Sequence, residues 1–191
     1  MTQFNQQENL APEMEAPAQR HRFIVWLPIV IAAIVILLDQ FSKYLVETNL
    51  AVYTYWAPIP ELNNFFRILH TTNTGAAFGL FASGGLFFAL MAVVVSGAII
   101  YFNRTLEGDQ IWIRIALGLQ MGGALGNFID RLRQGHVTDF LDFGPWPLFN
   151  VADMAVVFGT ILLAWLLLQE ERAQKAAAHD AEEKVDEGPT N

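Results

Sequence analysis

The chain contains no cysteine and only three serines in 191 residues. The lack of cysteine excludes disulfide bonds, thiolate catalysis and cysteine-bound zinc. None of the serines, Ser42, Ser83 and Ser96, lies in a G-x-S-x-G nucleophile motif, and the sequence has no phosphate-cradling loop. Ser42 and Lys43 are adjacent, so on a helix their side chains point in different directions and form a poor serine–lysine dyad.

Charged residues are also scarce, at 16% of the chain, whereas 53% of the residues are hydrophobic. This composition is too apolar for an ordinary soluble domain and suits one membrane domain. The net charge of −8 comes mainly from the ends, because residues 169–191 hold seven acids against three bases. The acidic balance argues against a nucleic-acid partner. We expect a polar tail over 1–22, a membrane domain over 23–168, and an acidic tail over 169–191 whose first part, near 170–178, extends the last helix.

Four segments are long enough to cross a bilayer, whose hydrocarbon core needs roughly 20 residues. They are Phe23–Gln40, Leu80–Phe102, Ile111–Ile129 and Val151–Leu168. The first follows a 22-residue polar tail and has no small-residue cleavage site behind it, so it is expected to remain as a span. The predicted fold is therefore an all-α integral membrane protein with four transmembrane helices.

The distribution of Lys and Arg predicts the orientation of these spans. Seven basic residues lie on the side of both tails and of the short loop near 103–110, against four on the other side. This bias places both termini in the cytoplasm. The five tryptophans fall near the predicted interfaces, where an amphipathic ring is favoured: Trp26, Trp56, Trp112, Trp146 and Trp165.

Two segments are then expected outside the membrane. The first, about 45–75, contains V-Y-T-Y-W (52–56) and F-F-R-I-L-H-T-T-N (65–73), which are typical of strands and are separated by a proline turn. It is predicted to form a small extracytoplasmic subdomain of strands with an interfacial helix. The second, Arg131–Asn150, holds several glycines and prolines and is predicted to be a loop.

Four aspartates lie at or just beyond the ends of apolar segments. Asp39 ends the first span, Asp130 ends the third, Asp139 follows in the loop, and Asp153 opens the fourth. With an even number of spans, all four acids belong to one layer at the outer face. A carboxylate beside hydrocarbon is costly, and it is therefore a candidate functional residue.

Asp139 and Asp153 are 14 residues apart across one loop and can face each other if the loop folds back. Two close carboxylates share one proton, so the ionised member can take a proton from water and the other can donate one to a scissile carbonyl. The alternative is that each only caps a helix or meets water, since an Asp near a helix start is a good capping residue.

Other polar residues are spaced to support this layer. Asn127 with Asp130 and Asn150 with Asp153 are i,i+3 pairs, Arg131 can clamp Asp130, and Asn73 precedes the second span. Asp39 and Lys43, at i,i+4 in acid-first order, are predicted to form a structural ion pair. A satisfied polar cluster that joins the spans is an alternative to a functional site, and both can hold together.

Three alternatives to a carboxylate peptidase remain open at this stage. His70 and His136 could join Asp139 on zinc, although no H-E-x-x-H motif exists. A proton- or ion-coupled transporter also uses membrane carboxylates, commonly near the midplane. A non-catalytic assembly factor could be held by the overlapping G-x-x-x-G motifs at Gly118, Gly122 and Gly126, which predict close helix packing.

Five blocks of the sequence, in order, resemble the bacterial lipoprotein signal peptidases, or type II signal peptidases. They are D-Q-F-S-K (39–43), N-T-G-A-A-F (73–78), G-G-A-L-G-N-F-I-D-R (122–131), V-T-D-F (137–140) and F-N-V-A-D (149–153). The similarity covers about Phe23–Leu168. Each block alone is weak evidence, but the set is specific.

The resemblance implies a membrane aspartic endopeptidase that removes signal peptides from diacylglyceryl-modified prolipoproteins, cleaving just before the lipidated cysteine. It implies catalysis by Asp139 and Asp153 through direct attack of water, with no metal or other cofactor and no obligate protein partner. It further implies a multi-pass protein of the bacterial inner membrane that acts near the extracytoplasmic face. The family's supporting residues fall on Asp39, Lys43, Asn73, Asn127, Asp130, Arg131 and Asn150, with Gly123 close to the substrate.

Overall fold

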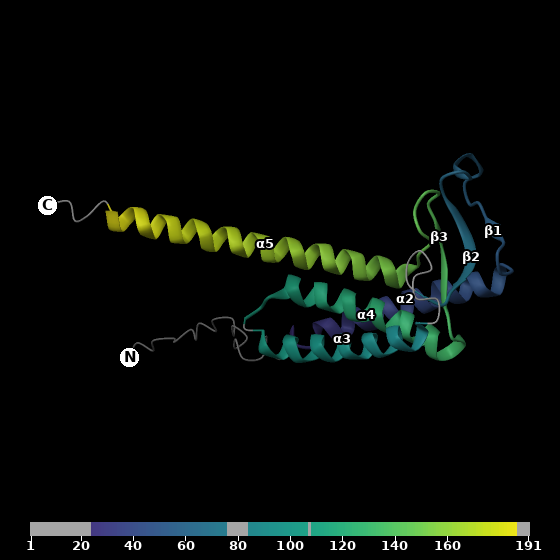
Figure 1. Ribbon diagram of the computed structural model, residues 1–191, viewed down its shortest axis with the longest axis horizontal. Coiled ribbons are helices and arrows are strands. Elements are labelled where there is room, and N and C mark those ends of the chain that lie inside the picture. Colours follow the sequence, from purple (N-terminus) through teal and green to yellow (C-terminus); the bar gives the residue numbers. More distant parts are fainter. Residues whose placement is uncertain (1–23, 76–83, 107, 187–191) are drawn as a thin grey trace, which may run out of the picture.

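The computed structural model describes residues 24–75, 84–106 and 108–186. Four helices run side by side, and a small sheet lies across one end of them (Figure 1). In chain order the elements are α2 (Leu27–Asn49), β1 (Tyr55–Trp56), the 3-10 helix η1 (Pro60–Leu62), β2 (Arg67–Asn73), α3 (Gly85–Thr105), α4 (Ile111–Gln134), β3 (Val137–Asp142) and α5 (Val151–Asp186). The tail 1–22, the start of the second expected span and part of N-T-G-A-A-F lie outside the described residues.

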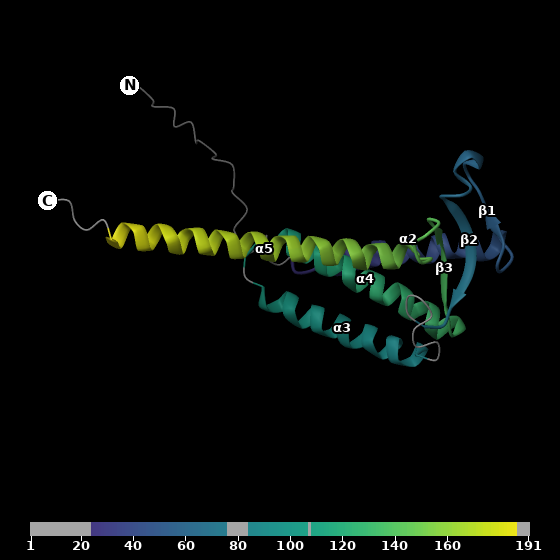
Figure 2. The same ribbon diagram turned by 45° about the horizontal axis from the view of Figure 1, so that its top comes forward.

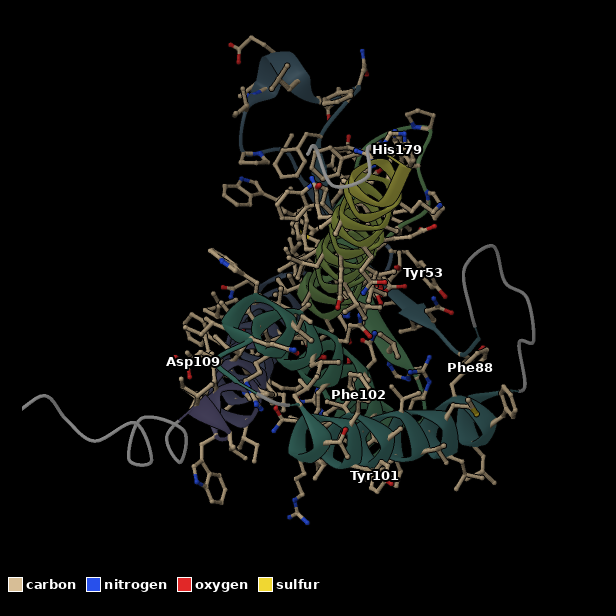
Figure 3. All side chains as sticks on the ribbon, turned by 90° about the vertical axis from the view of Figure 1, so that its left-hand side faces the viewer. Tyr53, Phe88, Tyr101, Phe102, Asp109 and His179 are labelled. Atoms are coloured by element: carbon tan, nitrogen blue, oxygen red, sulfur yellow. The ribbon has the colours of Figure 1, made fainter. Side chains whose placement is uncertain are left out.

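Three of the described helices are long and apolar enough to cross a membrane, namely Leu27–Asn49, Gly85–Thr105 and Val151–His179. Most of their apolar side chains are exposed, as suits contact with lipid. Tyr101 of α3, for example, is 74% exposed and points away from the other helices (Figure 3). The protein is therefore a multi-pass membrane protein by the length and composition of its helices.

The expected span at Ile111–Ile129 does not meet the same criterion, so a total of four spans is not confirmed. The physical reason is the position of α4, which packs against α2, α3 and α5. A helix surrounded by protein does not need an apolar surface all round, and α4 accordingly buries Arg114, Asp130 and several glycines.

The glycines of α4 allow the closest helix contacts. A Cβ added at Gly118 or Gly122 would come within 2.7 Å of Ile31 or Val35 on α2. A Cβ at Gly123 would lie 2.3 Å from the backbone oxygen of Ala152 on α5. The predicted G-x-x-x-G packing is thus confirmed for the α2–α4 contact. Gly123, expected beside the substrate, faces the backbone of α5.

The side chain of Arg114, in the first turn of α4, is fully buried. Its Nη1 donates to the backbone oxygen and to Oδ1 of Asn103, and its Nη2 donates to the backbone oxygen of Leu106 at 3.1 Å. These acceptors end α3, where a cation offsets the negative end of the helix dipole. Arg114 therefore ties α4 to the end of α3.

Helices α2 and α5 are longer than the segments predicted from the sequence. α2 continues through Asn49 instead of ending at Gln40, so 45–49 are helical. α5 continues past Leu168, and the expected extension over 170–178 is present. Both views show this part of α5 projecting beyond the other helices (Figures 1 and 2).

The sheet has the order β1-β2-β3, with both pairs antiparallel. β1 and β2 fall within the two predicted strand segments, and η1 occupies the proline-rich link between them. β3 is new, because Arg131–Asn150 was predicted to be only a loop. Gly135, with φ of 78°, ends α4 in the left-handed conformation and turns the chain into β3. In the register of this pair, Thr71 lies opposite Asp139 and Asn73 opposite Val137.

Candidate active site

Asp153 lies in the first turn of α5, held by a reciprocal capping arrangement with Asn150. The backbone N–H of Asp153 donates to Asn150 Oδ1 at 2.9 Å, and the backbone N–H of Asn150 donates to Asp153 Oδ2 at 3.2 Å. Two otherwise unpaired donors at the helix start are thereby satisfied. Capping, the alternative considered for this aspartate, is confirmed, and it also fixes the orientation of the carboxylate.

Asp139 reaches the same place from β3. Its side chain accepts hydrogen bonds from Asn150 Nδ2 at 2.7 Å and from Asn73 Nδ2 at 2.9 Å. Asn150 therefore contacts both aspartates, through its amide and through its backbone. Asp139 is 3% exposed, and its side chain and that of Asp153 line the same cavities.

Asn127 of α4 joins this pair to a deeper ionic cluster. Its Nδ2 donates to Asp153 Oδ1 at 2.7 Å, while its Oδ1 accepts from Asn150 Nδ2 at 3.1 Å and from Lys43 Nζ at 2.9 Å. The amide is thus held by donors and acceptors that leave it one orientation.

The deeper cluster is centred on Lys43, which is fully buried. Its Nζ lies 2.8 Å from Asp39 Oδ2 and 2.7 Å from Asp130 Oδ2, and both carboxylates are also fully buried. The predicted Asp39–Lys43 pair is confirmed. Asp39 Oδ1 additionally accepts the backbone N–H of Ala152 at 2.9 Å, so the cluster holds the start of α5.

Arg131 does not clamp Asp130 as predicted. It donates to the backbone oxygens of Asn127 at 3.2 Å and Gly75 at 3.3 Å, and its guanidinium lies 5.3 Å from the centre of the Phe88 ring. Asp130 is instead paired with Lys43, a residue far away in sequence. Arg131 thus lines the site and contributes positive charge near both Asp139 and Asp153.

Two cavities meet at the aspartate pair. One, of about 370 Å³, is lined by both aspartates, by Arg131 and by residues of α3 and α4. The other, of about 590 Å³, lies between the 146–149 segment and an apolar face of α5 that includes Val157 and Phe158. Both carboxylates therefore line one cavity that also carries polar side chains and another that is largely apolar.

The environment of Asp139 favours its protonated form. Burial and, next, the negative charge of Asp153 raise the pKa of Asp139 from 3.8 to about 6. The hydrogen bonds from Asn73 and Asn150 act in the opposite direction, because they stabilise the ionised form. The site therefore combines a carboxyl group that retains its proton at mildly acidic pH with a second carboxylate beside it.

Sequence reasoning missed three residues that contact this site. Gln40 Nε2 donates to Asp130 Oδ1 at 2.8 Å, and Thr138 Oγ1 donates to Glu47 Oε1 at 2.7 Å. Only their positions next to or one turn from Asp39, Lys43 and Asp139 could have suggested them.

His70, considered as a zinc ligand, lies 2.8 Å through Nδ1 from the backbone oxygen of Leu50. In 24–75, 84–106 and 108–186, no three His, Cys, Asp or Glu residues form a group that could hold a metal ion.

A multi-pass membrane protein with two neighbouring carboxylates in a partly apolar cavity is the class that this fold and site define. Residues 31–169 match the family described as signal peptidase (SPase) II. The chain belongs to this family, and it is therefore a peptidase. Because the family is one of peptidases, this assignment decides against the transporter and assembly-factor alternatives.

The chain is similar to known proteins over nearly the whole length of those proteins. The lipoprotein signal peptidase of Moorella thermoacetica is 45% identical over 140 residues, which cover 73% of this chain and 91% of the relative. That of Xanthomonas campestris is 40% identical over 164 residues, covering 80% and 94%. Two bacterial membrane enzymes solved by the in meso method, at 2.3 Å and 1.9 Å resolution, give TM-scores of 0.70 and 0.67. They are 33% and 34% identical, over 75% and 74% of this chain and 88% and 92% of theirs.

Proposed function

We propose that this protein is an aspartic endopeptidase that cleaves prolipoprotein signal peptides just before a diacylglyceryl-modified cysteine. The observation that carries the proposal is the convergence of Asp139 and Asp153 on one cavity, bridged by Asn150. Family membership supplies the substrate class. Carboxylates that share a proton supply the acid and the base that peptide hydrolysis needs.

The two aspartates have different surroundings, which supports a division of roles. Asp153 sits at the start of α5, where the helix dipole favours a negative charge. Asp139, whose pKa is raised to about 6 chiefly by burial, retains its proton more readily. In the proposed step Asp153 takes a proton from water, the water oxygen attacks the scissile carbonyl, and Asp139 donates a proton to the carbonyl oxygen. As the intermediate collapses and its C–N bond breaks, the carboxyl formed on Asp153 gives its proton to the leaving amine, and one hydroxyl of the intermediate returns a proton to Asp139, which restores both groups.

The arrangement of helices supports a location in the bacterial inner membrane. We assign α4 as a span as well, the third in chain order, shielded from lipid by its neighbours, with both termini cytoplasmic. The start of α2 and the far end of α5 lie at the opposite end of the bundle from the sheet (Figure 1). The sheet and the aspartate pair are then extracytoplasmic, in accord with the Lys/Arg bias.

The two cavities suit a substrate that remains partly in the bilayer. A signal helix and acyl chains need not leave the membrane if the scissile bond reaches the interface. The apolar cavity beside Val157 and Phe158 offers a surface for hydrocarbon, and the cavity with Arg131 and Asn127 offers polar groups for a peptide backbone. A site partly closed to water also strengthens electrostatic interactions within it.

The direct test is cleavage by the purified protein in detergent. A synthetic precursor with a diacylglyceryl cysteine is compared with the same peptide carrying an unmodified cysteine, in a chelator and without nucleotide. We expect cleavage of the lipidated peptide alone, with the modified cysteine at the new N-terminus by mass spectrometry. Equal cleavage of both peptides, or activity that returns only when zinc is added, would contradict the proposal.

The pKa of Asp139 predicts a particular pH dependence. Because Asp139 must hold a proton, kcat/KM should fall as the pH rises through about 6, and fall again at low pH when Asp153 is also protonated. In Asn73→Ala the hydrogen bond that lowers the pKa of Asp139 is lost, so the alkaline limb should move to higher pH. Asn49→Ala, at the exposed end of α2, is the matched control and should leave the limb in place. A shift to lower pH in Asn73→Ala would contradict the assignment of the acid.

The exposed aromatic residues in and just before β1 are expected to contribute to substrate binding. Tyr53, Tyr55 and Trp56 are 73%, 51% and 58% exposed, as suits aromatic rings that rest on lipid headgroups. Trp56→Gln should therefore raise KM several-fold with a smaller change in kcat. Single-turnover rates at saturating lipidated substrate separate the two effects. Normal binding with a lost chemical step would instead place this segment within the catalytic site.

A further inference from the structure

The position of Asp139 depends on how β3 is attached to the helices. Asp153 belongs to a helix of the bundle, whereas Asp139 belongs to a strand of the sheet at its end. Any movement of β3 therefore changes the relation between the two carboxylates. The strand is anchored at the residue just before Asp139, because the N–H of fully buried Thr138 donates to Asp130 Oδ2 at 3.3 Å.

The side chain of Thr138 makes a second attachment. Its hydroxyl accepts from Gln134 Nε2 at 3.0 Å and donates to Glu47 Oε1 at 2.7 Å. Glu47 also accepts from Arg133 Nη2, at 2.7 Å and 2.8 Å to its two oxygens. Glu47, Arg133, Gln134 and Thr138, which we call the Glu47 clamp, thus join the last turn of α2, the last turn of α4 and the start of β3.

We propose that Glu47 is a positioning residue for the peptidase reaction, acting through Thr138 to fix Asp139 relative to Asp153. The inference rests on the proposed function of the aspartate pair and adds a residue outside the sequence motifs. Successive strand side chains point to opposite faces, so the bond on Thr138 holds β3 from the face opposite to the Asp139 carboxylate. Asn73 and Asn150 hold the carboxylate itself.

The Thr138 bond should matter more than the Arg133 ion pair. The side chain of Arg133 is 45% exposed and that of Glu47 is 20% exposed, and exposed ion pairs contribute little. The Thr138 hydroxyl is buried, and a hydrogen bond to an ionised carboxylate is among the stronger ones. Misplacement of a reacting group by 1 Å can cost roughly 100-fold in rate, so a partial relaxation of β3 should be visible in kcat.

The experiment compares paired variants of the full-length protein in the lipidated-peptide assay. Glu47→Ala and Thr138→Val remove the bond, whereas Glu47→Gln and Thr138→Ser keep an acceptor and a hydroxyl. We expect the first pair to lower kcat roughly tenfold with little change in KM, and the second pair to retain most of the wild-type kcat. The double variant Glu47→Ala/Thr138→Val should be no slower than either single variant, because each single variant already removes the Glu47–Thr138 hydrogen bond.

The matched controls remove the same groups elsewhere. Glu171→Ala, on the exposed part of α5, and Thr160→Val, whose hydroxyl donates only within α5, should leave kcat unchanged. Thr138→Val against Thr138→Ser carries the test if Glu47→Ala fails to fold. Equal losses in Glu47→Ala and Glu47→Gln would assign the effect to Arg133 and overturn the proposal, as would normal kcat in Thr138→Val.

Asp139→Asn in the same assay separates this inference from the proposed function. If Asp139→Asn is inactive while Glu47→Ala and Thr138→Val turn over normally, the positioning role is wrong and the aspartate pair stands. If Asp139→Asn turns over normally, the aspartate mechanism is wrong whatever the clamp variants do, and the inference built on it is overturned with it.

Discussion

Asp139→Asn and Asp153→Asn are each expected to abolish cleavage while the protein still folds and inserts. The two carboxylates have different tasks in the proposed mechanism, and neither can perform those of both. Removal of a general acid or base typically costs roughly 10²–10⁴-fold in rate. Because the two carboxylates act as one pair, each variant should disable both proton transfers, and the loss should exceed this range. The measurement is the single-turnover rate at saturating lipidated peptide, with product identified by mass spectrometry.

The isosteric change keeps most contacts, so folding should survive. In Asp153→Asn the remaining side-chain oxygen can still accept the Asn150 backbone N–H that caps α5. In Asp139→Asn one oxygen can still accept from Asn150 Nδ2. Asp109→Asn, in the loop between α3 and α4 at the end of the bundle away from the sheet (Figure 1), is the matched control and should retain full activity. Near-normal turnover by either inserted site variant would remove that residue from the catalytic pair.

The sequence predicted features that depend on local spacing. The Asp39–Lys43 ion pair is separated by one helical turn, and the close contact between α2 and α4 follows from glycines spaced by four. The convergence of Asp139 and Asp153 required only one loop to fold back. Strand propensity also located β2, because its β-branched residues stand out from the surrounding prolines and asparagines.

Features that depend on distant partners could not be predicted. Lys43 and Asp130 meet only because α2 and α4 pack together, so Asp130 was assigned to its sequence neighbour Arg131. β3 escaped detection because glycines and prolines flank it and its pairing partner, β2, precedes it by two helices. The burial of Arg114 depends in the same way on carbonyls presented by the end of α3.

Lys43→Met is expected to give the largest loss of stability among single variants near the site. The ammonium group lies within 2.9 Å of Asp39, Asp130 and Asn127, so it has three acceptors for its three donors. Its removal leaves two fully buried carboxylates without a cation. Breaking a buried pair in this way typically costs about 3–5 kcal/mol. We expect a loss of this size in the free energy of unfolding, measured by denaturant titration in micelles.

The comparison that distinguishes charge from packing is the triple variant Asp39→Asn/Lys43→Met/Asp130→Asn. It removes the uncompensated charges and should recover most of the lost stability, since neutral replacements of buried ion pairs are often tolerated. Lys175→Met, which breaks an exposed pair with Glu171 on α5, should change stability little. Asn127 Oδ1 also loses the Lys43 donor in the triple variant, so the hold on Asp153 weakens and kcat should remain low. Full recovery of activity together with stability would show that Lys43 acts only as a structural counterion.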